Sequence, residues 1–352
     1  MVAAIKLSRL GLAAWLAASF LVPAAHAQKW EKPAAPFPEA SEELYGVAAN
    51  GKFYAFGGLG KAWTPKGLMY EYDPGANKWT KKNNMPLALH HPAWAELNGK
   101  IYVFGGFVKP EKGPTAWMPI NNAWAYDPAN DNWKALAPMP SKRGAASAAV
   151  VGGKIYVIGG AGVHPGSKET ALHPARPHRS VDTNEVYDPA TDTWQSRQTM
   201  PTARNHAFAG AVDDKIYVIG GRVGAAFITR ASNTGIVEEY DPATNQWGAV
   251  KASMPNPRSA GASGTFKGRI YTAGGEERST GPWQRTFRAV EAYDPSTNRW
   301  EVLPDMTIPR HGLAGDILNG RFHLVSGDVS SGGATDTQID TDVHEVLNLD
   351  GK

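Results

Sequence analysis

The sequence predicts an all-β protein built from repeated four-stranded units. The first observation is a short strand that ends in two glycines and recurs as NGKIYVFGG at Asn98–Gly106, GGKIYVIGG at Gly152–Gly160 and DDKIYVIGG at Asp213–Gly221. The second is a Tyr-Asp-Pro after each of these strands, with a tryptophan seven residues beyond the tyrosine. β-Branched and aromatic residues favour strands, and glycines that tolerate positive φ end them.

Each unit contains four expected strands, which we name a to d. Strand a is an Ala/Gly-rich stretch such as Gly144–Val151, because small residues fit beside a crowded central axis. Strand b is the stretch that ends in the glycine pair. Strand c ends at the tyrosine of YDPATDTW (Tyr187–Trp194), where Asp and Pro occupy the first two positions of a turn, and strand d carries the tryptophan.

Six such units follow one another with a period of ~50 residues, which is typical of β-propeller blades. The pattern resembles the Kelch family, whose hallmark is a double glycine followed by spaced Tyr and Trp. The resemblance covers nearly all of residues 28–352 and implies a six-bladed Kelch β-propeller with four antiparallel strands per blade. The blades are expected near residues 41–85, 89–139, 143–200, 204–254, 258–306 and 310–352.

The sixth unit lacks a d strand of its own, because the chain ends after VHEVLNL. The N-terminal segment Lys29–Ala40 (KWEKPAAPFPEA) matches Lys78–Leu89 (KWTKKNNMPLAL), which carries the d strand of the first unit. We therefore expect residues 28–40 to supply the missing d strand and to close the ring.

Residues 1–27 have the pattern of a secretory signal peptide: Lys6 and Arg9, an apolar run over Leu10–Val22, and a small-residue cleavage site at Ala25-His26-Ala27. Cleavage is expected near Ala27/Gln28, which predicts a periplasmic or secreted protein with one propeller domain over residues 28–352. The apolar run is shorter than the ~20 residues that a membrane span needs.

Composition excludes several functional classes. Loss of Lys6 and Arg9 with the signal peptide lowers the formal charge from +3 to +1, so no overall basic field predicts binding of nucleic acid. The chain has no cysteine, which excludes disulfides, thiolate metal sites and thiol nucleophiles. Copper-radical galactose oxidases, which resemble this chain in their Kelch repeats, need a Tyr–Cys crosslink and are excluded too. No cofactor and no metal site are predicted, and we expect a monomer.

Loop lengths indicate where a ligand would bind. The distance from each tryptophan to the next glycine pair is 26 or 27 residues, whereas the b–c connections vary, with 15 to 28 residues between glycine and tyrosine. Because the strands alternate in direction, the b–c and d–a loops share one face. Variable loops on a repeated scaffold usually carry binding.

An arginine opens four of the six inner strands on this face, ten or eleven residues after a tryptophan. Together with nearby histidines these arginines are the predicted ligand-binding residues, for an acidic sugar or an acidic peptide or protein segment. The structural alternative is that the arginines bond backbone carbonyls or carboxylates. The predicted set is Arg143, Arg204, Arg258, Arg310, His90, His206 and His311.

Three acids follow the last two glycine pairs and are the candidate catalytic residues: Glu276, Glu277 and Asp328. One of them would serve as general base in a sugar mutarotase or epimerase, which is the alternative function. The chain also resembles the exported Kelch propellers that act as sialic acid mutarotases, but only in the generic repeat, so no catalytic residue is carried over. The structural alternative makes the three acids counter-ions of the arginines.

The remaining motifs of the loops favour no metal. His164, His173 and His178 lie in the longest b–c loop, which is broken by prolines and has no recognisable metal-ligand spacing. The acidic stretch Asp336–Asp342 lacks the glycine and the final glutamate of a calcium loop. Aromatic residues of these loops would stack on a sugar, anchor a peptide or pack the loops: Trp63, Phe107, Trp117 and Trp283.

Overall fold

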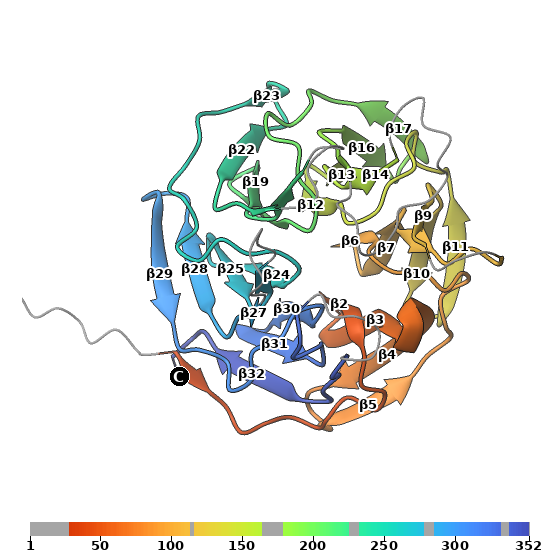
Figure 1. Cartoon of the computed structure of the whole chain (residues 1–352), viewed down its shortest axis with the longest axis vertical. Helices are drawn as coiled ribbons and strands as arrows, with labels where there is room; N and C mark the ends of the chain where they lie inside the picture. Colours follow the sequence, from red (N-terminus) through yellow and green to blue (C-terminus); the bar gives the residue numbers. More distant parts are fainter. Residues whose placement is uncertain are drawn as a thin grey trace, which may run out of the picture.

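Six four-stranded antiparallel sheets surround a central axis in the computed structural model (Figure 1). The structure describes residues 28–112, 116–163, 179–224, 232–277, 285–331 and 338–351. The inner strands lie nearest the axis and the d strands lie at the rim. The predicted fold, a six-bladed propeller with four strands per blade, is confirmed.

Each blade runs from strand a at the axis to strand d at the rim. Blade 1 contains β2 (Glu42–Ala49), β3 (Lys52–Gly60), β4 (Thr64–Asp73) and β5 (Lys78–Lys81). Blade 2 contains β6 (Ala93–Leu97), β7 (Lys100–Phe104), β10 (Ala123–Asp127) and β11 (Asn132–Leu136). Blade 3 contains β12 (Ser147–Val151), β13 (Lys154–Ile158), β16 (Asn184–Asp188) and β17 (Thr193–Ser196).

The other three blades follow the same plan. Blade 4 contains β18 (Phe208–Val212), β19 (Lys215–Ile219), β22 (Val237–Asp241) and β23 (Gln246–Trp247). Blade 5 contains β24 (Ala262–Phe266), β25 (Arg269–Ala273), β28 (Val290–Asp294) and β29 (Arg299–Leu303). Blade 6 contains β30 (Ala314–Leu318), β31 (Arg321–Val325), β32 (His344–Asn348) and β1 (Lys29–Trp30).

The b–c connections begin as short extensions of the blades. In blades 2 to 5 these are two-stranded ribbons: β8 (Phe107–Val108) with β9 (Met118–Pro119), β14 (Ala161–Gly162) with β15 (Arg179–Ser180), β20 (Arg222–Val223) with β21 (Ser232–Asn233), and β26 (Glu276–Glu277) with β27 (Arg285–Thr286). In blade 1 the short 3-10 helix η1 (Lys61–Trp63) joins the strands. No helix in the described residues is long and apolar enough to span a membrane.

The N-terminal segment closes the ring as predicted. In the β1–β32 pair Lys29 lies opposite Asn348 and Trp30 lies opposite Leu347. Beyond β1 the segment stays bonded to the last blade, because the Phe37 amide donates to the Asp342 carbonyl at 2.8 Å. The first and last segments of the described chain therefore share one sheet.

The Tyr and Trp of the repeat hold the scaffold together. The Tyr126 hydroxyl donates to the side chain of Asp131 in the c–d turn at 2.7 Å, and Asp131 has a positive φ of 48°. The Trp133 indole nitrogen donates to the Asn83 carbonyl in the preceding blade at 3.0 Å. The equivalent tryptophans, which make the same bond to the segment before them, are Trp79, Trp194, Trp247 and Trp300.

Candidate functional site

The four predicted ligand-binding arginines point into the blades. Their side chains are at most 1% exposed. The Arg258 Nε donates to the Gly274 carbonyl at 2.7 Å, and Arg143 makes the same bond to Gly159 at 2.9 Å. Each guanidinium is paired with a buried glutamate of strand c in its own blade: Arg143 with Glu185, Arg204 with Glu238 at 2.9 Å, Arg258 with Glu291, and Arg310 with Glu345 at 2.8 Å.

This geometry favours the structural alternative for the arginines. Burial lowers the pKa of all four guanidinium groups, and the paired glutamates oppose that shift. An ion pair that is complete inside a blade leaves no charge for a ligand on the face. Ser41 and Leu89 hold the equivalent positions in blades 1 and 2, so two blades lack this pair.

The three predicted acids have other partners, so the suggestion that they neutralise the arginines is corrected. Glu277 pairs with the exposed Arg285 at 2.6 Å. Asp328 accepts hydrogen bonds from the backbone amides of Ser330 at 2.8 Å and Ile339 at 2.9 Å, so it organises its own loop. Glu276 is buried near the axis, where it pairs with Arg222 of blade 4.

A backbone ring surrounds the axis two residues after each arginine position, and we call it the axial ring. Its members all have positive φ between 51° and 57° and come one from each blade: Glu43, His91, Ala145, His206, Ala260 and Gly312. Four consecutive amide-to-carbonyl bonds of 2.7 to 3.1 Å run from Gly312 through Ala260, His206 and Ala145 to His91. The ring thus fixes the direction of five side chains, since Gly312 has none.

Half of the axial ring carries polar side chains. The His91 Nε2 lies 3.2 Å from a Glu43 carboxylate oxygen, and the centroids of the His91 and His206 rings are 4.6 Å apart. The Trp117 ring covers His91 with a centroid distance of 5.0 Å. Ala145, Ala260 and Gly312 are the other three members, and Ala145 lies between His91 and His206 around the ring.

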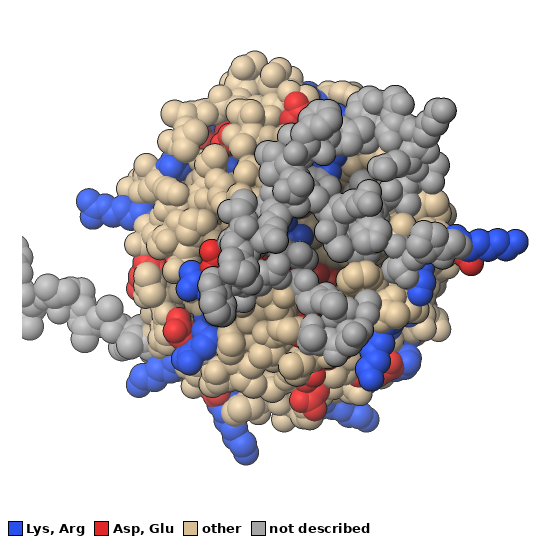
Figure 2. Space-filling model, in the orientation of Figure 1, with Lys and Arg blue, Asp and Glu red and all other residues tan. Residues whose placement is uncertain are grey.

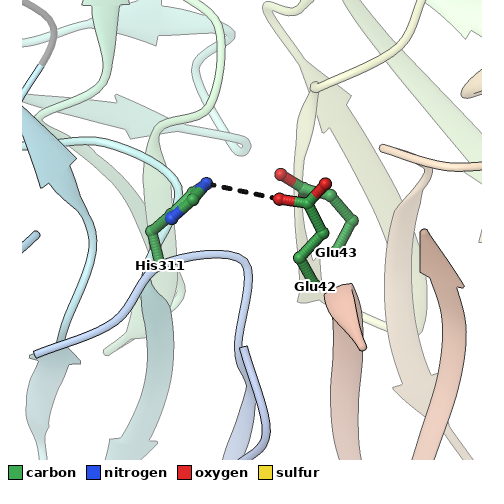
Figure 3. A group of neighbouring side chains, drawn as sticks. All are labelled: Glu42, Glu43 and His311. Atoms are coloured by element: carbon green, nitrogen blue, oxygen red, sulfur yellow. Dashed lines mark ion pairs between the residues drawn. The ribbon is translucent and has the colours of Figure 1, made fainter. Parts of the chain in front are cut away.

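Glu42, Glu43 and His311 converge where blade 1 meets blade 6. One ligand atom from each residue lies within 4.8 Å of the other two, and all three residues are buried. In Figure 3 the imidazole of His311 faces the two carboxylates at the start of β2. The His311 Nε2 is 3.8 Å from Glu42 and 4.0 Å from Glu276. We call Glu42, Glu43, His91, Glu276 and His311 the axial cluster.

The two adjacent glutamates have opposite pKa shifts. Burial, followed by repulsion from Glu43 and Asp328, raises the pKa of Glu42 well above its ordinary value. Burial acts in the same direction on Glu43, but attraction and hydrogen bonding from His91 outweigh it and lower the pKa of Glu43. A proton is therefore held more readily on Glu42 than on its neighbour.

The structure brings together part of the predicted site and adds residues to it. His90, His206 and His311 lie at the axis with Glu276. Sequence reasoning left four residues out of the predicted site: Glu42, Glu43, His91 and Arg222. Glu42, Glu43 and His91 lie one or two residues after Ser41 or Leu89, which hold the arginine position in blades 1 and 2. A comparison of these two positions across all six blades would have found them. His164, His173, His178, Trp283 and the signal peptide lie outside the described residues.

Comparisons with known proteins agree with this architecture. Residues 27–228 match the family "Attractin/LZTR1 beta-propeller", and residues 257–307 match the Kelch motif. The chain belongs to the Kelch-repeat β-propeller family. Its likeness to the solved "Structure of YjhT" has a TM-score of 0.71 at 20% identity, covering 89% of this chain and 96% of that one, and shows the shared fold.

The Kelch chain is also similar to longer proteins. It is 29% identical to Kelch-like protein terF of Aspergillus terreus over 85% of its own length and 64% of the relative. It is 28% identical to human Kelch-like protein 23 over 77% of its length and 43% of that protein. The chain therefore spans less than two thirds of these relatives.

Proposed function

We propose that this Kelch propeller is an exported binding protein whose ligand is held at the axial cluster. The main support for this proposal is that buried, ionisable side chains gather at one point of an otherwise regular ring. Burying such groups costs free energy unless they are paired, and the structural pairs of the scaffold lie elsewhere in the blades. The b–c and d–a connections of the scaffold reach this same face.

The charge of the axial cluster favours a hydroxyl-rich neutral sugar over the acidic ligand predicted from the arginines. The axial cluster contains three carboxylates, from Glu42, Glu43 and Glu276. The guanidinium of Arg222 lies beside the cluster and is paired with Glu276. Carboxylates accept hydrogen bonds from hydroxyl groups, and a neutral imidazole can donate one hydrogen bond to a hydroxyl and accept another. At the outer rim of the face in Figure 2, Lys and Arg project from the surface and acidic side chains appear beside them.

Titration with a panel of neutral and acidic sugars tests the proposal. Glu43→Gln should weaken binding of the neutral sugar by ~10-fold or more, because a hydrogen bond to a charged group contributes ~1.5–3 kcal/mol. Glu277→Gln, on the same face but paired with an exposed arginine, is the matched control and should bind as the native chain does. Binding of acidic peptides alone, or equal binding by both variants, would contradict the proposal.

The second candidate function is a sugar mutarotase or epimerase. The opposite pKa shifts of Glu42 and Glu43 favour it, because adjacent groups with separated pKa values can act as general acid and general base. Glu42 would protonate the ring oxygen of the sugar while Glu43 accepts a proton from the anomeric hydroxyl.

Turnover distinguishes an enzyme from a binding protein. For the enzyme, Glu42→Gln should lower kcat for anomer exchange, followed by NMR, by ~100-fold with little change in affinity. If neither the native protein nor the variant raises the rate of anomer exchange above the uncatalysed rate, binding is the function.

Export and a monomeric state complete the proposal. The expected mature chain begins at Gln28 and is found outside the cytoplasm. Mass spectrometry of the protein from fractionated cells should detect this N-terminus, and light scattering should give the mass of one chain. Full-length protein in the cytoplasmic fraction alone would argue against export.

A further inference from the structure

Three candidate metal ligands from opposite ends of the chain meet in the axial cluster. Glu42 and Glu43 begin β2 of blade 1, and His311 precedes β30 of blade 6. Their ligand atoms lie within 4.8 Å of one another, and the residues are at most 7% exposed. Two oxygens and one imidazole nitrogen thus face a common point (Figure 3).

The surroundings of the His311 imidazole also indicate a ligand between this side chain and the carboxylates. Its Nδ1 is buried without a hydrogen-bond partner within the described residues. Its Nε2 points at Glu42 and Glu276 from 3.8 and 4.0 Å, which is beyond hydrogen-bonding distance. The Nε2 of this buried imidazole therefore faces two carboxylates without a hydrogen bond to either, and an ion between them would give that nitrogen a partner, although it would leave Nδ1 as it is.

The distance between the His311 and Glu42 side chains is closer to that between two ligands of one metal ion than to a hydrogen-bond distance. Imidazole nitrogens and carboxylate oxygens bind Zn²⁺ from about 2.0–2.2 Å, so two ligands of one ion stand roughly 3–4 Å apart. The 3.8 Å between His311 and Glu42 falls in that range, and the three ligand atoms all lie within 4.8 Å of one another, so a small movement of the side chains would complete the site. The second carboxylate is already oriented, because Glu43 contacts the His91 Nε2 at 3.2 Å and accepts from the Tyr45 hydroxyl at 3.4 Å. Such outer contacts are typical of metal-binding side chains.

We propose that Glu42, Glu43 and His311 bind one divalent transition-metal ion, Zn²⁺ or Mn²⁺. Ca²⁺ and Mg²⁺ prefer oxygen donors alone, whereas a mixed set with imidazole suits transition metals. Three protein ligands leave a coordination position for water or a sugar hydroxyl. The inference rests on the axial cluster being the binding site of the proposed function, and bound metal would displace the proton that the mutarotase mechanism places on Glu42.

The experiment uses the metal alone, so its failure leaves the sugar-binding proposal standing. The full mature chain, stripped with EDTA, is titrated separately with Zn²⁺, Mn²⁺, Ca²⁺ and Mg²⁺. We expect one Zn²⁺ or Mn²⁺ per chain at this site. Glu42→Gln and His311→Gln should each weaken that binding at least ~10-fold, as even outer-contact changes commonly do. Glu277→Gln should leave the affinity unchanged.

X-ray absorption of the Zn²⁺-loaded chain supplies a second readout, which does not depend on the folding of any variant. One imidazole in an otherwise oxygen-containing shell supports the proposal. Two or more imidazoles would place the ion at other histidines and overturn it. No stoichiometric binding of Zn²⁺ or Mn²⁺, a preference for Ca²⁺ or Mg²⁺, or unchanged affinity in folded variants of both ligands would overturn it as well.

Discussion

This chain buries two sets of charged side chains whose surroundings differ, and Arg310 of one set directly precedes His311 of the other. The arginine–glutamate pairs of blades 3 to 6 are each complete within a single blade, as in Arg258 with Glu291. The axial cluster instead joins blades 1, 2, 5 and 6, and its Glu42 and His311 stand 3.8 Å apart, beyond hydrogen-bonding distance. Burial alone therefore does not mark a functional charge. What distinguishes the cluster is that its charges come from several blades and that His311 stands apart from both Glu42 and Glu276.

The largest expected effect follows from deleting residues 28–40. The axial cluster spans the junction that β1 closes, whereas the arginine–glutamate pairs are internal to their blades. We expect the deletion to remove much of the free energy of unfolding, which is ~5–15 kcal/mol for a typical protein. Urea denaturation measures this loss. A truncated chain as stable as the native one would show that closure does not depend on the segment.

Arg258→Ala should have the next largest effect. It leaves Glu291 as an unpaired buried charge, and loss of one partner from a buried pair costs ~3–5 kcal/mol. The free energy of unfolding measures it. Arg258→Met combined with Glu291→Leu is the control, and should recover most of the loss, because no charge is then buried. A single variant that lost sugar binding while retaining its stability would instead give the arginine a ligand role.

A buried pair of neutral histidines provides a third case for the comparison. His323 Nδ1 and His344 Nε2 are 2.9 Å apart inside blade 6. Burial, assisted by Arg321, lowers the pKa of His323 to about 4, and burial with His323 lowers that of His344 to about 3. The unfolded chain therefore binds more protons, so this contribution to stability is present above pH ~6.5 and is lost as pH falls toward ~4.

The expected loss between those pH values is on the order of 3 kcal/mol for one histidine. His323→Tyr should reduce it, because tyrosine occupies the matching b-strand position in the other five blades. Urea denaturation at several pH values compares the two chains. The same pH dependence in both would show that this histidine pair does not control acid stability.

The smallest effect is expected for Glu277→Gln. Glu277 is partly exposed and its partner Arg285 is mostly exposed, and such surface pairs contribute ~0–1 kcal/mol. The melting temperature should therefore change little, and binding at the axial cluster should not change. A large change in either measurement would extend the cluster to this residue.

The repeat patterns were enough to predict the six blades, their strand order and the closure by residues 28–40. These features follow from local signals, namely glycine pairs, the Tyr-to-Trp spacing and the match between Lys29–Ala40 and Lys78–Leu89. Each signal describes one unit that buries its apolar residues against its neighbours, so its repetition is sufficient to predict the ring.

Which charges meet became visible only in the folded chain. The spacing placed Arg143, Arg204, Arg258 and Arg310 at the start of the inner strands on the loop face, but it did not show that their side chains turn inward to glutamates of strand c. Glu42 and His311 come together because the ring closes on itself, although most of the chain separates them. Side-chain direction and contacts between distant segments depend on packing in three dimensions, which a repeat does not encode.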